Sequence, residues 1–157
     1  PPDEQTIKQD VIDATVAAWT AFNELLLAPD DDDLLAGVAE VLAGDALERA
    51  VELAVSYRAN NQAERTHPTY PATVQIAEGA VQFDPTTQVA IVEYCRLGSN
   101  IWVEVAPNPD GTDRGIDDSI NSYLESDTLS LDDGKWVKTD GITLAKYLGV
   151  LECPPAG

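Results

Sequence analysis

The chain has 157 residues, of which 28 are acidic and 9 basic, so its formal net charge at pH 7 is −19, and 44% of its residues are hydrophobic. This length and apolar share predict one globular domain with a substantial core and exclude a largely disordered chain. The acidic excess disfavours binding to nucleic acids or anionic membrane surfaces, and no apolar run is long enough for insertion into a membrane. We interpret the charge as a solvated acidic surface.

The opening segment "PPDEQTIKQD" is polar and lacks the apolar stretch of a signal peptide. Residues 1–4 are predicted to be a linker stub, and the absence of methionine fits a mature domain trimmed from a longer precursor. Within a single domain spanning residues 1–157, we expect a helical part over residues 4–61 and a sheet part over residues 70–153.

Three helices are predicted in the first sixty residues. From Glu4 to Ala28, apolar residues recur at steps of three and four, which is typical of an amphipathic helix. The "DDDD" segment then supplies Asp33 as the N-cap of a second helix, expected at about residues 34–43. In "GDALE", Asp45 and Glu48 have the spacing of a capping box, which predicts a third helix that the "ANNQ" segment ends.

Antiparallel strands are predicted after the proline-containing loop "RTHPTYPA". The segment "TVQIAEGAVQF" alternates with Gly79 as a bulge, "QVAIVEYCRL" alternates most clearly, and "NIWVEVAPN" follows a turn. The segment "NPDGTDRGIDD" fails the EF-hand pattern for calcium and is expected to be an acidic loop. "INSYLESDTLSL" and "KWVKTDGITLAKYLGVLEC" flank "DDG", a strong hairpin signal. The predicted fold is therefore α+β, with three N-terminal helices packed on the concave face of a curved antiparallel sheet of four to six strands.

This order of elements resembles that of the nuclear-transport-factor-two-like superfamily, a cone-shaped α+β fold that includes ketosteroid isomerase, scytalone dehydratase and limonene epoxide hydrolase. The segments "AGDALERAVELAVSYRANN", "VAIVEYC" and "DDGKWVKTDG" resemble secreted or lipid-anchored actinobacterial members of unassigned function. The resemblance implies a cavity between the long helix and the sheet. It also implies that Cys95 pairs with Cys153 and that the protein is extracytoplasmic, in the cell envelope or secreted.

The residues alone leave several roles open for Cys95 and Cys153, the two cysteines of the chain. Together with the single histidine, they do not supply the four ligands of a structural zinc site, and they form no Cys-x-x-Cys redox motif. A disulfide between neighbouring strands, two buried free thiols and a catalytic cysteine remain as alternatives. The even count favours the disulfide, which would indicate an oxidising compartment.

The expected cavity raises the question of which side chains face it. Glu93 is a candidate for a catalytic base, since it shares strand parity with Val89 and Ile91, and a carboxylate facing an apolar cavity would have a raised pKa. We favour a rim or paired position for Glu93 over this role. The single His67 excludes the two-histidine site of some superfamily enzymes and is expected at the surface or the cavity mouth. An Asp–Arg–Asp set stays open. Aromatic residues that could line a pocket or fill the core are Trp19, Phe22, Tyr57, Tyr94, Trp102, Tyr123, Trp136 and Tyr147.

We therefore expect a non-enzymatic extracytoplasmic domain, without a cofactor or metal, that binds a small apolar ligand or a protein partner as a monomer or homodimer. One alternative is a cavity enzyme of the isomerase, dehydratase or epoxide-hydrolase type that uses a buried Asp or Glu. Another is an assembly subunit that pairs through a strand edge or the N-terminal helix.

Overall fold

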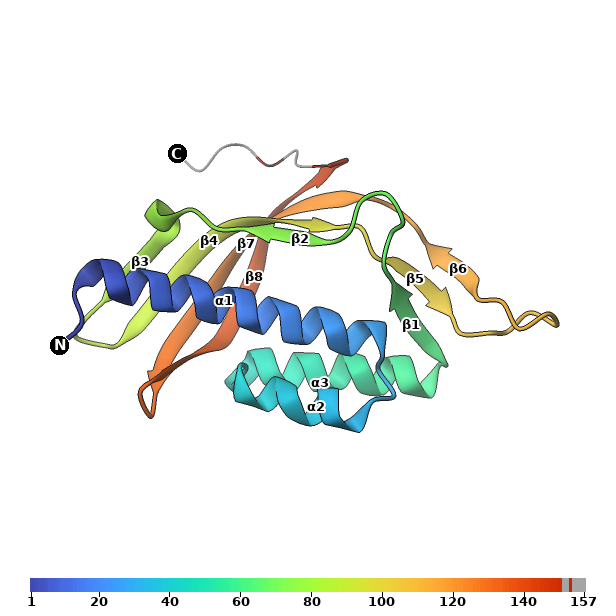
Figure 1. Ribbon diagram of the computed structural model, residues 1–157, viewed down its shortest axis with the longest axis horizontal. Helices are drawn as coiled ribbons and strands as arrows, with labels where there is room; N and C mark the ends of the chain where they lie inside the picture. Colours follow the sequence, from blue (N-terminus) through green and yellow to red (C-terminus); the bar gives the residue numbers. More distant parts are fainter. Residues whose placement is uncertain (151–152, 154–157) are drawn as a thin grey trace.

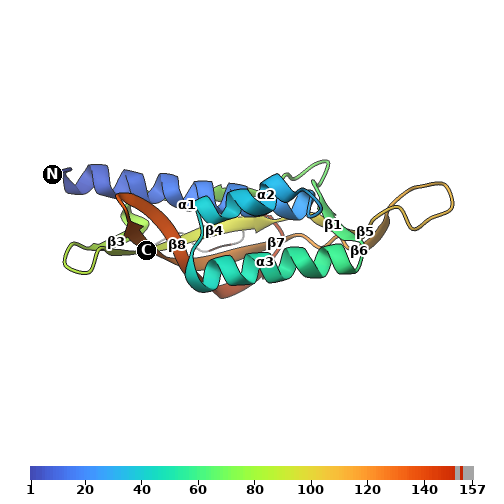
Figure 2. The same ribbon diagram turned by 90° about the horizontal axis from the view of Figure 1, so that it is seen from below.

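The structure, a computed structural model, describes residues 1–150 and Cys153. Helices α1 (Glu4–Leu27), α2 (Asp32–Gly37) and α3 (Gly44–Ala59) lie on one face of antiparallel β-structure (Figure 1, Figure 2). The predicted α+β class, with three helices packed against an antiparallel sheet, is confirmed. Within the described residues, no helix is both long and apolar enough to span a membrane.

In the part of the chain that the structure describes, eight strands form two sheets. A five-stranded sheet has the order β2-β4-β7-β8, with β3 also paired to β4, and a three-stranded sheet has the order β1-β5-β6. The second sheet was not predicted, because β1 and β6 are short and polar, and β6 is exposed at every position. The strands are β1 (Gln62–Arg65), β2 (Thr73–Gln75), β3 (Val81–Asp84), β4 (Val89–Gly98), β5 (Ile101–Glu104), β6 (Arg114–Asp117), β7 (Asn121–Asp132) and β8 (Lys135–Leu148).

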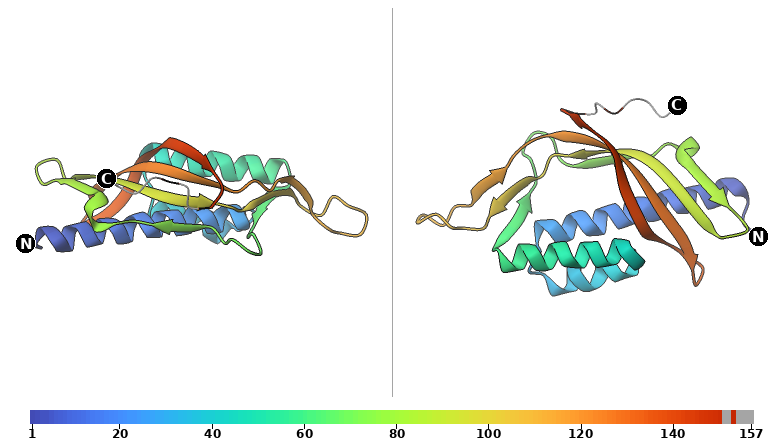
Figure 3. Two further views of the ribbon diagram at one scale, coloured as in Figure 1. Left: turned by 90° about the horizontal axis from the view of Figure 1, so that it is seen from above. Right: turned by 180° about the vertical axis from the view of Figure 1, so that it is seen from behind.

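Strands β4–β5 and β6–β7 form one long, bent hairpin that belongs to both sheets. Gly98 pairs with Asn121 before the bend, and Trp102 pairs with Asp117 after it. At the bend, the hydroxyl of Ser99 donates a 2.5 Å hydrogen bond to the carbonyl of Tyr70. The bend turns the three-stranded sheet toward the helices, as the view from behind shows (Figure 3).

The first helix follows the prediction closely, but its start lies inside the predicted linker stub. Asp3 is the N-cap of α1, and its side chain accepts a 2.7 Å hydrogen bond from the backbone N–H of Thr6. Residues 3 and 4 are therefore part of the helical structure. The long apolar stripe packs on the sheet as the periodicity indicated.

The predicted caps of the second and third helices were wrong. Asp31, not Asp33, caps α2, and the helix gives way to a 3₁₀ turn at residues 38–40. Helix α3 begins at Gly44 after an N-cap at Ala43, so Asp45 lies in its first turn. For α3 the reason is tertiary, since residues 41–43 bond to the backbone of Lys138 and the chain enters the helix from this bridge.

Two other local predictions also differ from the structure. Gly79 lies in a 3₁₀ turn at residues 78–80 between β2 and β3, not in a bulge. The predicted acidic loop contains strand β6. The last predicted strand ends at Leu148, and its residues 151 and 152 lie outside the described residues.

The core has two apolar clusters separated along α1. The first lies between the N-terminal half of α1 and the sheet, and consists of Val11, Val81, Ala90, Val92, Tyr94, Leu129 and Trp136. The second joins the helices and the turn after α2, and consists of Ala18, Leu25, Val38, Leu42, Ala46, Ala50 and Ala54. The first cluster covers only part of the inner sheet face. The rest of that face lies opposite helices α1 and α3.

Candidate functional site

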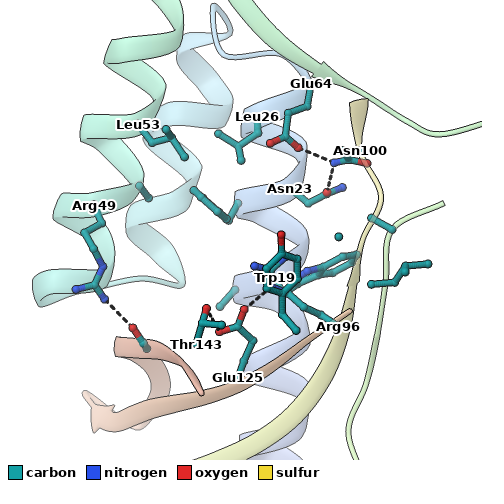
Figure 4. Close-up of a pocket in the computed structure, with 18 of the residues that line it drawn as sticks. Trp19, Asn23, Leu26, Arg49, Leu53, Glu64, Arg96, Asn100, Glu125 and Thr143 are labelled. Carbon is teal, nitrogen blue, oxygen red and sulfur yellow. Dashed lines mark hydrogen bonds and ion pairs between the residues drawn. The ribbon is translucent and has the colours of Figure 1, made fainter. Parts of the chain in front are cut away.

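A cavity of about 560 Å³ lies between the C-terminal half of α1, helix α3 and the inner face of the sheet (Figure 4). This volume falls within the range of about 300–1,000 Å³ that is typical of small-molecule sites. At one end, the rings of Tyr57 and Trp102 stack with their centroids 6.1 Å apart. Apolar side chains that the helices contribute to the wall are Ala18, Trp19, Phe22, Leu26, Ala46, Ala50 and Leu53.

The opposite wall, formed by the sheet, is polar. Along β4, the inner face carries Ala90 and Val92 in the core and then Tyr94 and Arg96 at the cavity. Along β7, Leu129 of the core is followed toward the cavity by Asp127 and Glu125. The same sheet face therefore changes from apolar to polar at the point where the cavity begins.

An ion pair between Arg96 and Glu125 crosses the polar wall. Arg96 Nε lies 2.7 Å from Glu125 Oε1, and the hydroxyl of Thr143 donates to Glu125 Oε2 at 2.9 Å. The Arg96 guanidinium carbon lies 4.2 Å from the centroid of the Tyr123 ring, a cation–π contact. The contacts with Arg96 and Thr143 hold the Glu125 carboxylate in a fixed position on the wall (Figure 4).

A second ion pair lies deeper. Asp127 is only 1% exposed, and its Oδ2 accepts a 2.7 Å hydrogen bond from the Tyr94 hydroxyl and lies 2.9 Å from Lys138 Nζ. Burial and the adjacent Asp127 charge raise the pKa of Tyr94 far above its usual value, so Tyr94 remains a hydrogen-bond donor. Gly141 faces this carboxylate, and a Cβ at that position would lie 2.5 Å from Asp127 Oδ1. Glycine is therefore needed for this close approach.

Glu64 forms a third polar group at the end of the cavity near the bent hairpin. Its carboxylate accepts hydrogen bonds from Asn100 Nδ2 at 2.8 Å and from the Tyr57 hydroxyl at 3.3 Å. Asn100 Nδ2 also donates to Asn23 Oδ1 of α1. Burial and the negative charge of Glu64 raise the pKa of Tyr57 above its usual range. Sequence reasoning missed Glu64 because β1 lacks an alternating pattern.

Most of the predicted pocket aromatics do line the cavity. Trp136 does not, because it packs edge to face on Phe83 in the first core cluster, with 5.6 Å between ring centroids. Tyr147 is half-buried outside the lining. The aromatic residues found in the lining are Trp19, Phe22, Tyr57, Tyr94, Trp102 and Tyr123.

The two predicted candidates for proton transfer lie away from the cavity. Glu93 is exposed and adjacent to Tyr94, so the alternation of β4 places it on the opposite sheet face. Glu93 therefore does not face the cavity. His67 accepts hydrogen bonds through Nδ1 from the backbone N–H groups of Thr69 and Tyr70, which stabilises its loop.

Cys95 and Cys153 form a disulfide, with their Cα atoms 6.0 Å apart. Cys95 follows Tyr94 on β4, so it faces away from the cavity and the helices. The disulfide links the segment after β8 to the outer face of the central strand. Neither thiol is available as a nucleophile, and the described residues contain no cluster of three or more His, Cys, Asp or Glu that could hold a metal ion.

Comparisons with known proteins show a shared fold. No family model matches the sequence, and no curated protein matches it. The solved structure of the intermembrane space region of the chloroplast protein ARC6 is similar, with a TM-score of 0.62 and 18% sequence identity. The match covers 92% of this chain and 98% of that chain, so the likeness extends over the whole fold.

Proposed function

We propose that this chain is a non-enzymatic binding domain that holds a small ligand in the cavity between the helices and the sheet. The change of the inner sheet face from apolar to polar at the cavity carries this proposal. Polar groups facing a protein interior cost free energy relative to apolar packing, so a stable core alone does not explain them. Such departures from an apolar core are expected at functional sites.

The state of the two deepest carboxylates supports binding over catalysis. Asp127 and Glu125 are each matched by a cation and a hydroxyl donor, and Asp127 has almost no exposed surface. A general base must come within hydrogen-bond reach of the proton that it removes. Carboxylates held in this way serve to position neighbouring donors.

The disulfide supports a location in an oxidising, extracytoplasmic compartment, because structural disulfides persist there and are rare in the cytosol. We also propose that the protein is secreted or lipid-anchored and that it belongs to the nuclear-transport-factor-two-like superfamily. The order of three helices before the strands supports the superfamily assignment. The oligomeric state and an assembly role stay predictions.

Titration with N-phenyl-1-naphthylamine, an uncharged apolar fluorophore, tests the binding proposal. We expect saturable binding in the wild type. Leu53→Trp should fill the cavity and weaken binding at least about 10-fold, because the larger indole would occupy the space that the ligand needs. Val55→Trp is the matched control, because Val55 lies on the same helix and is 53% exposed. Absence of saturable binding, or equal binding by the Leu53→Trp variant, would contradict the proposal.

A second candidate function is favoured by Glu64. This cavity carboxylate accepts from the neutral donors Asn100 and Tyr57, and no ion pair involves it among the described residues. It could therefore act as the base of an isomerase, dehydratase or epoxide hydrolase. Hydrolysis of a small epoxide such as styrene oxide, abolished by Glu64→Gln, would support this candidate. Equal rates in wild type and variant would reject it.

A further inference from the structure

We infer that the ligand is facially amphipathic, meaning a rigid molecule that is apolar on one face and carries hydroxyl or carbonyl groups on the other. This inference rests on the proposed function and adds the chemical class of the ligand. It refines the sequence-based expectation of a small apolar ligand.

The helical wall recognises an apolar surface. The side chains of Trp19, Phe22, Leu26 and Leu53 project from two helices into the cavity and offer aliphatic and aromatic contact. The polar side chains on this side are already engaged, Asn23 by Asn100 and Arg49 by Asp140. Contact between an apolar ligand face and these side chains would remove apolar surface from water, which lowers the free energy of the bound state.

The sheet wall recognises hydrogen-bonding groups. Arg96 donates its Nε–H to Glu125, and the other N–H groups of its guanidinium are further donors. The side chains of Arg96 and Lys138 remain 30% and 23% exposed, so both reach the cavity. Tyr123, stacked under Arg96, adds a phenol to the lining. Together these donor groups can form hydrogen bonds to oxygen atoms of a ligand.

Charge pairing indicates that the ligand groups facing Arg96 and Lys138 are uncharged. Arg96 and Lys138 are neutralised by Glu125 and Asp127, so a charged ligand group would meet no unmatched partner on this wall. Burying an unmatched charge is costly. The net charge of −19 further disfavours anionic groups.

The arrangement of the walls distinguishes a facial amphiphile from a head-to-tail amphiphile. The apolar and polar walls face each other across one cavity, so they contact opposite sides of the same molecule. A ligand with a polar head and a linear tail would place its tail against Arg96 and Tyr123. Such a tail would leave the donors of that wall without partners, which is unfavourable.

Two probes with the same ring skeleton test the inference, and both carry their carboxylate on a flexible side chain that can remain in water, so the effect of the charge cancels in the comparison. Cholate carries hydroxyl groups on one face, and 5β-cholanate lacks them. In calorimetric titrations below the micellar concentration, we expect cholate to bind at least about 10-fold more tightly, although it is the less hydrophobic probe. Tyr123→Phe should weaken cholate binding about 3- to 10-fold and leave cholanate binding unchanged. Tyr147→Phe, a matched change of a tyrosine outside the cavity lining, should alter neither.

The outcomes separate this inference from the proposed function. If 5β-cholanate binds as tightly as cholate while N-phenyl-1-naphthylamine binds the wild type, the facial specificity is refuted and cavity binding stands. If neither N-phenyl-1-naphthylamine nor either bile-acid probe binds, the proposed function itself is refuted. If Tyr123→Phe and Tyr147→Phe have equal effects on cholate, the assignment of the sheet wall as the hydroxyl-binding face is overturned.

Discussion

Replacing Lys138 with methionine should lower the free energy of unfolding by about 3 kcal/mol at neutral pH. Lys138 Nζ lies 2.9 Å from Asp127 Oδ2. In the variant, this buried carboxylate would lose its cation and keep the hydrogen bond from the Tyr94 hydroxyl at 2.7 Å. Removing one partner of a buried ion pair costs about 3–5 kcal/mol. The lower end applies here, because the Lys138 side chain is 23% exposed and water can approach the pair.

Urea unfolding at pH 7, followed by tryptophan fluorescence, would measure this effect. Adding Asp127→Asn to the Lys138→Met variant removes the stranded charge and should recover at least half of the lost stability. Lys146→Met on the same strand is the control, because Lys146 is exposed, and it should change the stability by less than about 0.5 kcal/mol. A loss below about 1 kcal/mol for Lys138→Met, or no recovery in the double variant, would refute the reasoning.

Two further perturbations test the fold. Replacing both Cys95 and Cys153 with serine should lower the free energy of unfolding by about 2–4 kcal/mol, since the disulfide closes a loop with a sequence separation of 58 and constrains the unfolded chain; an unchanged urea midpoint would contradict this. Because burial and Asp127 raise the pKa of Tyr94 in the folded state, the unfolded chain loses this proton first, and stability should fall as pH rises above about 10. Urea midpoints from pH 8 to 11 should decline less steeply for Tyr94→Phe than for the wild type, and equal slopes would exclude this contribution.

Several elements could be predicted because their signals are local. The three- and four-residue spacing in α1, the alternation in β4 and the "DDG" turn between β7 and β8 each act within one segment. The starts of α2 and α3 could not be predicted in the same way. Several aspartates compete as caps before α2, and the bridge from residues 41–43 to Lys138 sets the entry into α3.

The cavity, too, could be predicted only in part. The aromatic composition indicated that Trp19, Phe22 and Tyr57 could line a pocket, and the structure places all three there. The pattern in β4 did not indicate which face is internal, because Ile91 and Val92 are both apolar and lie on opposite faces. For this reason the sequence left open whether Glu93 faces the cavity.

The sequence by itself determined the α+β class, the extent of α1, the β7–β8 hairpin and the supply of aromatic residues, because each depends on periodicity, turn chemistry or composition over a few neighbouring residues. Only the tertiary structure decided which face of β4 is internal, where α3 begins and which carboxylates are paired. These outcomes depend on contacts between residues distant in sequence, such as Asp127 with Lys138 and Tyr94 and Glu64 with Asn100. The polar wall of the cavity consists of such contacts, so no local pattern in the chain could reveal it.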